Sequence, residues 1–393
     1  MWIDIGKFET MKKTLFVIMS SILLLTSSCE KDPIDQNKSY KISEVTIEGV
    51  TYNKLEGIVS ENLTLDPSKK WLLSGGVFVD NGVTLTIDGG QTVYADPELT
   101  TFLSIKQGGK IIAEGTQNNP IVLTPLKSDP TYGDWGGIII NGKAKLNTGL
   151  TAEGEGGTGI YGGDDDEDNS GILRFIRVEY AGKVLGTDNE LNGFSFNGVG
   201  SGTVVEYIQA YKGADDGIEF FGGTVNVRYA VSNYNQDDAF DWTHGWRCKG
   251  QYWYCQQGPD GGDRGIEADN NGDDNNLQPY SNPTLANITL NGVDDGDASN
   301  EGMRLREGTK GKIYMAVVSG FAKYGIRVTE QATLDHVTNG ELFVANSTIS
   351  GNGTNFKDCS SFDGLTLTLT DNWFYPETQP GSGGQWMNGW TRQ

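Results

Sequence analysis

The sequence is poor in histidine, cysteine, proline and basic residues, and each shortage argues against a class of protein. Two histidines and four cysteines leave little material for a zinc site. Eleven prolines are too few for a disordered or collagen-like chain. Lys and Arg number 30 against 52 Asp and Glu, a net charge of −22, so we expect no nucleic-acid partner, because phosphate binding needs a basic face. This acidity is compatible with divalent cations or basic ligands.

The sequence also lacks an apolar run long enough to span a membrane. Its longest apolar run is typical of an export signal. Met11–Lys13 is basic and is followed by Thr14–Leu25, an apolar stretch of about a dozen residues that is too short to span a bilayer. Small residues then lead to Cys29. This order resembles the signal of bacterial lipoproteins, in which the cysteine is lipidated and becomes the first mature residue. We therefore predict a signal peptide over residues 1–28, with Met11 as the true start, and lipidation of Cys29.

The residues after the predicted lipidation site are polar. Residues 29–40 are expected to form a tether. Their short acidic stretch, Glu30–Asp32, resembles the surface-export signals of Bacteroidetes-type lipoproteins. The predicted location is the outer membrane, reached through the lipid anchor, and the sequence leaves open whether the protein faces the periplasm or the cell surface.

Glycine is abundant, with 55 of 393 residues, and the repeats of the chain account for it. Residues 203–223 recur as 224–245 with a 22-residue offset, so that Glu219 aligns with Asp241 and Phe220 with Trp242. Each unit is a short alternating strand, a Gly/Asn/Asp turn and another strand. A coil of 22–24 residues cannot bury its inner face alone, which predicts a stacked parallel β-solenoid. Glycine would supply the tight corners with positive φ.

The predicted solenoid body covers residues 41–393. Two Gly-rich acidic segments, at about 148–171 and 256–282, are expected to be loop insertions. The first lacks the spacing of an EF-hand, so we expect a disordered loop there rather than a specific Ca²⁺ loop. Asp363–Thr370 alternates and predicts a strand in a C-terminal end cap.

Two sets of motifs resemble known families. Gly108–Thr124 and the repeated coils resemble right-handed parallel β-helix proteins of the pectin-lyase-like superfold, which implies an all-β fold. Four further segments are similar to a family of exported bacterial lipoproteins, namely Gly162–Gly171, Val178–Gly182, Asp215–Gly223 and Asp241–Trp246. The second resemblance implies a fold and a location but no activity.

Charged residues are expected to form an outward column. If Ile218 and Phe220 point inward, Glu219 between them points outward. The aligned residues of the other coils then form one outer column with it, which consists of Ser195, Glu219, Asp241, Glu267, Arg304 and Arg327. Coils stack at about 4.8 Å, so neighbouring carboxylates must take up a proton or share a cation. With Asp216 and Asp238 in the preceding turns, Glu219 and Asp241 predict a Ca²⁺ site. The alternatives are turn capping by Asp215, Asp216, Asp237 and Asp238, and a solvated acidic face at Glu219 and Asp241.

Aromatic and sulfur-containing residues lie close to this column in the sequence. Trp246 and Trp253 are predicted to be exposed platforms that stack on sugar rings, whereas Trp242 aligns with inward Phe220 and is expected to be buried. His244 is interpreted as a structural or a ligand-facing turn residue. Export would permit a disulfide between Cys248 and Cys255, although their spacing does not decide whether they face each other.

Three functions remain open at the level of sequence. The leading hypothesis is a lipid-anchored, non-catalytic binding protein for glycan, with Trp246, Trp253, Glu267 and Arg327 as ligand-binding residues. The first alternative is a Ca²⁺-dependent polysaccharide lyase or hydrolase, in which Glu219 and Asp241 hold Ca²⁺ against a uronate and Arg304 or Arg327 abstracts a proton. The second alternative is a structural partner of membrane proteins in an outer-membrane assembly.

Overall fold

The structure is a computed structural model of the chain, and it describes residues 40–186, 189–293, 300–376 and 379–393. The predicted signal peptide, its lipidation site Cys29 and all but the last residue of the predicted tether lie outside the described residues. Within the described ranges, no helix combines the length and the apolar character needed to cross a membrane.

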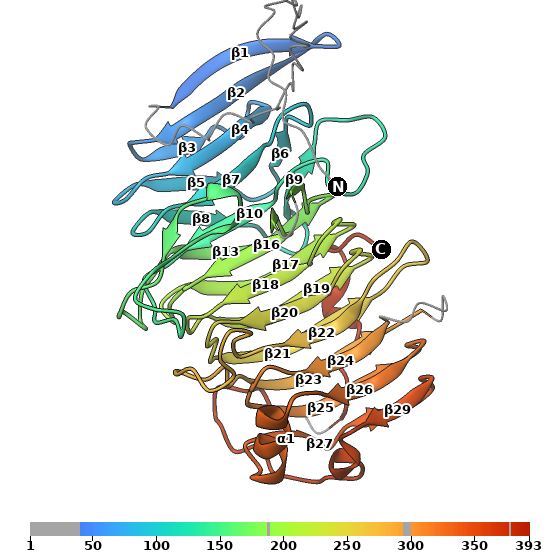
Figure 1. Cartoon of the computed structure of the whole chain (residues 1–393). Helices are drawn as coiled ribbons and strands as arrows, with labels where there is room; N and C mark the ends of the chain where they lie inside the picture. The colour runs from blue at the N-terminus through green and yellow to red at the C-terminus, as the bar shows by residue number, and fades with distance from the viewer. Residues whose placement is uncertain (1–39, 187–188, 294–299, 377–378) are drawn as a thin grey trace, which may run out of the picture. The chain divides into compact units, whose positions relative to one another are not determined.

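The strands of successive coils stack into three parallel ladders of one 25-stranded sheet (Figure 1). The first ladder carries the charged residues and consists of β7 (Phe102–Ile105), β10 (Ile138–Asn141), β16 (Phe194–Asn197), β18 (Ile218–Phe221), β20 (Phe240–Thr243), β22 (Arg264–Ala268), β24 (Glu301–Leu305), β26 (Tyr324–Val328) and β29 (Thr354–Lys357). β2 (Val50–Val59) and β4 (Trp71–Val79) precede it. The predicted all-β parallel β-helix is confirmed.

Six long strands each contribute to both the second and the third ladder, because a corner divides them. They are β13 (Gly171–Glu179), β17 (Val204–Tyr211), β19 (Asn226–Asn233), β21 (Lys249–Gln256), β23 (Thr284–Asn291) and β25 (Gly311–Ser319). The second ladder adds β3 (Leu63–Leu65), β5 (Thr84–Asp88), β8 (Lys110–Glu114) and β27 (Leu342–Ala345). The third adds β6 (Thr92–Ala95), β9 (Ile121–Pro125) and β28 (Thr348–Ile349).

The remaining elements are short or lie at the ends of the ladders. β1 (Lys41–Ile47) pairs antiparallel with β2 at the N-terminal end. Two small hairpins project from the coils, β11 (Ala152–Glu153) with β12 (Ile160–Tyr161) and β14 (Val184–Gly186) with β15 (Asn189–Glu190). The helical elements are α1 (Gln331–Thr338) and the single 3₁₀ turns η1 (Glu155–Gly157), η2 (Ser360–Phe362) and η3 (Gln385–Met387).

Residues other than glycine occupy the corner within the long strands, and in β13, β17, β19 and β21 they are aromatic. Phe175, Tyr207, Tyr229 and Tyr252 all have positive φ, between 50° and 62°. Their rings stack on one another, with centroids 4.1, 4.1 and 4.9 Å apart along the series. A left-handed conformation costs a bulky residue roughly 1–2 kcal/mol, and an aromatic pair returns about 0.5–1.5 kcal/mol beyond its buried area. The stack therefore offsets the strain that glycine was expected to relieve.

The acidic segment at 148–171 is folded, so the prediction of a disordered loop is wrong. Its hairpin lies over the first ladder, where the Thr158 carbonyl accepts hydrogen bonds from Ser104 Oγ at 2.6 Å and Asn141 Nδ2 at 3.2 Å. Asp166 in its acidic run pairs with Arg247 at 2.7 Å. Repulsion within the run is thus relieved by neighbouring basic and polar groups. The segment predicted as the second insertion contains β22, and its loop follows that strand.

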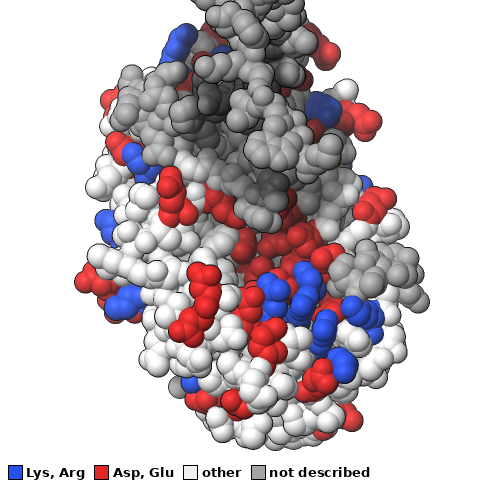
Figure 2. Space-filling model, viewed as in Figure 1, with Lys and Arg blue, Asp and Glu red and all other residues white. Residues whose placement is uncertain are grey.

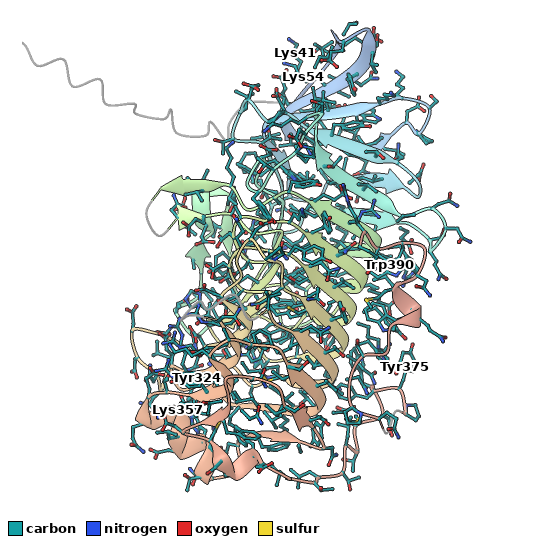
Figure 3. All side chains as sticks on the ribbon, turned by 90° about the vertical axis from the view of Figure 1, so that its right-hand side faces the viewer. Lys41, Lys54, Tyr324, Lys357, Tyr375 and Trp390 are labelled. Carbon is teal, nitrogen blue, oxygen red and sulfur yellow. The ribbon has the colours of Figure 1, made fainter. Side chains whose placement is uncertain are left out.

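The C-terminal residues run back along the outside of the coils. Asp363–Thr370 forms no strand, contrary to the prediction. Beyond it, 371–376 and 379–393, which we call the return segment, lie beside the six long strands, as the labels on Tyr375 and Trp390 in Figure 3 show. The Gln251 side chain accepts a hydrogen bond from the Tyr375 N–H at 2.9 Å and donates one to the Tyr375 carbonyl at 3.1 Å. Side-chain amides of the coils thus form the hydrogen bonds to the backbone of the return segment that a neighbouring strand would otherwise form.

Candidate functional site

The first ladder brings the predicted charged residues into register. Glu219 on β18 pairs with Asp241 on β20, which pairs with Glu267 on β22. Arg304 on β24 follows Glu267, and Arg327 on β26 follows Arg304. Adjacent strands lie about 4.8 Å apart, so three carboxylates are followed by two guanidinium groups. We call these five residues the charged column.

Turn carboxylates join the acidic half of the column. Carboxylate oxygens of Asp216, Glu219 and Asp241 lie within 4.8 Å of one another, and so do those of Asp238, Asp241 and Glu267. The four predicted metal ligands therefore fall into two overlapping groups that share Asp241. Carboxylate oxygen is the ligand that Ca²⁺ prefers, so the donor chemistry of both groups fits this ion.

The two turn aspartates also connect neighbouring coils. Asp216 Oδ1 accepts a hydrogen bond from the Asp238 N–H at 2.9 Å, and Asp238 Oδ1 accepts one from the Arg264 N–H at 2.6 Å. Each carboxylate therefore bonds to the next coil rather than to its own turn, which overturns the alternative of own-turn capping for this pair. Asp238 Oδ2 lies 3.5 Å from Arg264 Nη1, which leaves the second oxygen of Asp216 for a cation or a proton.

Buried polar groups hold part of the acidic half in place. Asn192 donates from Nδ2 to Glu219 Oε2 at 2.5 Å. Arg264 Nε lies 3.1 Å from Glu267 Oε1, and its Nη1 lies 3.5 Å from Asp238 Oδ2. Asp241 Oδ1, in contrast, is buried without a hydrogen-bond partner among the described residues. Asp241 is thus the carboxylate of the column that most needs a partner.

Burial and mutual repulsion raise the pKa values of this cluster. Burial raises the pKa of Asp216, Glu219 and Asp241 well above the usual range of a carboxyl group, and neighbouring carboxylates add to the shift. Burial, followed by the charge of Asp237, raises the pKa of Asp215 to about 8. Burial likewise raises the pKa of Asp237 to about 6. At neutral pH the cluster must therefore retain protons or share a cation.

The basic half of the column differs from the acidic half in its pairing. Arg327 Nη1 lies 3.1 Å from Glu301 Oε1, so Arg327 is partly neutralised. Arg304 forms no ion pair with any described residue, and its Nε is buried without a hydrogen-bond partner. Figure 2 shows acidic side chains gathered in the middle of the visible face with basic ones directly beside them. Arg304 thus offers a positive charge next to a strongly acidic surface.

The predicted sugar platform is not present. Trp246 and Trp253 are fully buried, so neither ring is available to a ligand. The Trp246 ring stacks on Phe220 inside the coil, with centroids 4.1 Å apart. Trp253 follows the corner at Tyr252 and packs 4.7 Å from the Phe240 ring. Trp242 is buried, as predicted.

The proposed disulfide between Cys248 and Cys255 is also absent. Both thiols are free and buried. Cys248 directly precedes β21 and Cys255 lies at its far end. An extended strand rises about 3.3 Å per residue. The Cα atoms of the two residues are therefore much farther apart than the roughly 4.4–6.8 Å that usually separates disulfide-bonded Cα atoms.

The structure adds site residues that were missed in the sequence. Arg306 Nη2 lies 2.8 Å from Glu267 Oε2, and its Nε lies 2.7 Å from Asp269 Oδ1. Arg306 and Asp269 come two positions after Arg304 and Glu267, so the strand alternation that defined the column could have identified them. Asn192 lies outside any strand, two residues before β16, where no periodic signal marks it.

A family model for the pectate-lyase-like β-helix domain matches residues 57–391. The chain belongs to this family. No curated protein matches it. Among solved structures, the chain is similar to the periplasmic alginate epimerase AlgG, with 13% sequence identity, coverage of 86% of this chain and 94% of that one, and a TM-score of 0.32.

Proposed function

We propose that the charged column binds an acidic polysaccharide, with Ca²⁺ between the acidic half and the ligand and with Arg304 in direct contact with a ligand carboxylate. The guanidinium of Arg304, which forms no ion pair with any described residue and lies one strand away from Glu267, is the observation that carries this proposal. A chain with a net charge of −22 repels a polyanion unless cations lie between the two. The acidic half of the column could bind such cations, and the basic half supplies the guanidinium cation of Arg304.

The acidic half has the properties that a Ca²⁺ site requires. Asp216, Glu219 and Asp241 supply oxygen ligands within 4.8 Å of one another. Ca²⁺ takes about six to eight oxygen ligands, so three side chains leave positions for water and for the carboxylates of a ligand. A bound Ca²⁺ would also partner Asp241 Oδ1, which has no other partner among the described residues.

The basic half would recognise the carboxylate of a uronic acid unit. A guanidinium group binds a carboxylate through two parallel hydrogen bonds, which gives orientation as well as affinity. Arg304 can form this pair without breaking an ion pair to any residue that the structure describes. Arg327, whose charge is shared with Glu301, would contribute less.

A second candidate function is a lyase or hydrolase that acts on the same ligand. Asp241 favours it, because burial raises the pKa of this carboxyl group well above its usual range, and its Oδ1 has no hydrogen-bond partner among the described residues, so that it can act in proton transfer. In a lyase, Ca²⁺ would neutralise the uronate carboxylate and Arg304 would lie near the proton to be removed. Release of unsaturated or shortened oligosaccharides would distinguish this function from binding alone.

We further propose that the protein acts at the outer membrane, anchored through Cys29. The N-terminal signal pattern supports this location. Incorporation of labelled palmitate into the wild type but not into Cys29→Ser would test it. Co-purification of membrane proteins in place of any glycan binding would instead favour a structural partner of an outer-membrane assembly.

Retention on immobilised polygalacturonate and alginate tests the proposed function. The purified protein is compared in CaCl₂ and in EDTA, and released products are followed by absorbance at 235 nm and by reducing-end assay. We expect Ca²⁺-dependent retention without product. Asp241→Asn should lose the Ca²⁺ dependence, and Arg304→Gln should weaken binding about tenfold, because hydrogen bonds to charged groups contribute about 1.5–3 kcal/mol.

Arg174→Gln is a matched control for Arg304→Gln. Arg174 lies on the second ladder, where it pairs with Glu114 and Glu206. This control should bind like the wild type. Failure of both polymers to bind in Ca²⁺, or wild-type binding by Arg304→Gln, would overturn the proposal, and product formation would replace it with the catalytic alternative.

A further inference from the structure

A small pocket lies between the hairpin of the 148–171 segment and the ends of β16, β18 and β20. It has a volume of about 180 Å³, and its lining includes Glu153–Glu155 and Tyr161 from the hairpin and Asn197, Phe221 and His244 from the coils. Neither the charged column nor the proposed function uses these residues. Pockets for drug-sized ligands begin at about 300 Å³, so this pocket has room for a single ring.

The Asn197 side chain lines this pocket and carries an acceptor without a partner among the described residues. Asn197 is 2% exposed, and its Nδ2 donates to Asn141 Oδ1 at 3.0 Å. Asn141 Nδ2 is committed to Ser104 Oγ and the Thr158 carbonyl, at 3.1 and 3.2 Å. This chain of hydrogen bonds fixes the orientation of both amides. Asn197 Oδ1 is therefore a buried acceptor with no partner among the described residues.

The His244 ring supplies a second unpartnered polar atom. His244 Nδ1 is buried and has no hydrogen-bond partner among the described residues. Burial lowers the pKa of His244 to about 4, so the ring is neutral at pH 7 and offers one donor and one acceptor nitrogen. An unpartnered buried polar group costs about 1–3 kcal/mol. A ligand that forms hydrogen bonds with both Asn197 and His244 would therefore remove this cost, which would favour its binding.

The chemistry of the lining selects a hydroxyl-bearing ring. Asn197 Oδ1 requires a donor, and the neutral imidazole can either donate or accept, which a hydroxyl group matches in both directions. The Phe221 ring lies 6.3 Å from the Tyr161 ring and 5.7 Å from the His244 ring, centroid to centroid. Aromatic carbon beside polar acceptors suits the apolar face and the hydroxyl edge of a pyranose.

We propose that this pocket is a subsite for one neutral pyranose ring, with its hydroxyl groups bonded to Asn197 Oδ1 and His244 Nδ1. Asn197 and Phe221 are direct partners two positions beyond Ser195 and Glu219 on the same strands. Two residues of a strand span about 6.6 Å, so the subsite lies next to the charged column. The inference rests on the proposed function in one respect, namely that both sites bind the same polysaccharide.

The chain offers a direct probe, because it contains only two histidines. The protein labelled with ¹⁵N-histidine gives ring signals from His244 and His336, and a His244→Asn variant assigns them. Asn accepts the positive φ of 54° at this position better than most residues do. The probes are methyl glycosides of glucose, galactose, mannose and N-acetylglucosamine, titrated to 100 mM in EDTA.

At least one glycoside should shift the His244 signals saturably, in the millimolar range, and leave those of His336 unchanged. Tyr161→Phe removes one hydroxyl from the lining and should weaken that binding about two- to tenfold. Absence of any shift, or equal shifts of both histidines, would overturn the subsite. A shift confined to His244 but insensitive to Tyr161→Phe would place the ligand outside the pocket and overturn it as well.

The two experiments can contradict one proposal without contradicting the other. The glycosides carry no carboxylate and the titration contains no Ca²⁺, so a His244 shift without retention on polygalacturonate or alginate contradicts the proposed function and supports the subsite. Retention of those polymers without any His244 shift supports the proposed function and contradicts the subsite.

Discussion

Glu267 and Arg304 are direct partners on β22 and β24, and the charge of the column changes sign between them. Asp241 continues the column on the acidic side, and Arg327 continues it on the basic side. A polyanion lying along the column would need added cations over one half only. The column therefore defines a direction along the solenoid, and a bound polymer would meet its two halves in a fixed order.

The first prediction concerns the pH dependence of stability without metal. The folded pKa values of Asp215 and Asp237, about 8 and about 6, exceed the unfolded value of about 3.9. The folded state therefore binds protons more tightly, so the stabilisation is complete below about pH 4 and is lost as the pH rises through 6 and 8. In EDTA, the melting temperature should fall between pH 5 and pH 8.

Added Ca²⁺ should reverse this fall, because it replaces the protons of the cluster. Thermal melting in CaCl₂ should show a larger stabilisation at pH 8 than at pH 5. Asp241→Asn removes one charge and one ligand, and should reduce both the fall and its reversal. A melting temperature in EDTA that rises steadily up to pH 8 would contradict the prediction.

The second prediction concerns Arg306, which bridges two buried carboxylates. Arg306→Ala should lower the free energy of unfolding by about 3 kcal/mol at pH 7.5, because Glu267 and Asp269 would lose their common partner. The loss should shrink at pH 5, because burial raises the pKa of Asp269 to about 7 and this carboxyl group then takes up a proton. Urea denaturation at the two pH values measures this, and an equal loss at both would show that packing, not charge, is responsible.

The third prediction concerns the return segment. Trp390 is fully buried, with its ring 5.8 Å from that of Phe175 and 5.9 Å from that of Tyr207. Trp390→Ala should cost about 3–5 kcal/mol of stability. Tyr375→Ala is the control, since its side chain is 46% exposed and should cost less than about 1 kcal/mol. Chemical denaturation measures both, and similar costs would indicate that the segment is only loosely attached.

The fourth prediction concerns the thiols. Cys248, Cys255 and Cys359 are free and buried, and burial raises their pKa values. Dithiothreitol should therefore leave the melting temperature unchanged. A thiol reagent should label these residues in guanidinium chloride but only slowly in the native protein. A fall in melting temperature on reduction would reveal a disulfide among them.

The repeat made the ladder predictable. A 22-residue offset with strict alternation fixes both the register and the outward side, so Glu219 and Asp241 could be paired from the sequence alone. The same pattern placed Arg304 next to Glu267 although 37 residues separate them, because insertions between strands do not alter the register. Hydrogen bonds between coils, such as that of Asn192 to Glu219, carry no periodic signal and required the structure.

The aromatic residues show where alternation fails as a guide. Tyr252 lies at a corner with positive φ, and the inward and outward positions change there. Trp253 after this corner therefore points into the core, where the sequence placed an exposed ring. Trp246 lies in a turn that folds under Phe220, beyond the reach of any strand pattern. The conformation of a single residue, Tyr252, thus decided the position of Trp253.

The return segment has a consequence for the order in which the chain can mature. Gln117 Nε2 donates to the Asn388 carbonyl, across 271 residues of sequence. A chain that emerges with its N-terminus first can stack coil upon coil, because each coil contacts only its neighbours. The early coils nevertheless contact residues near position 388, which are synthesised much later. Completion of the fold therefore requires docking of the return segment, and its removal would expose coils far away in the sequence to proteolysis.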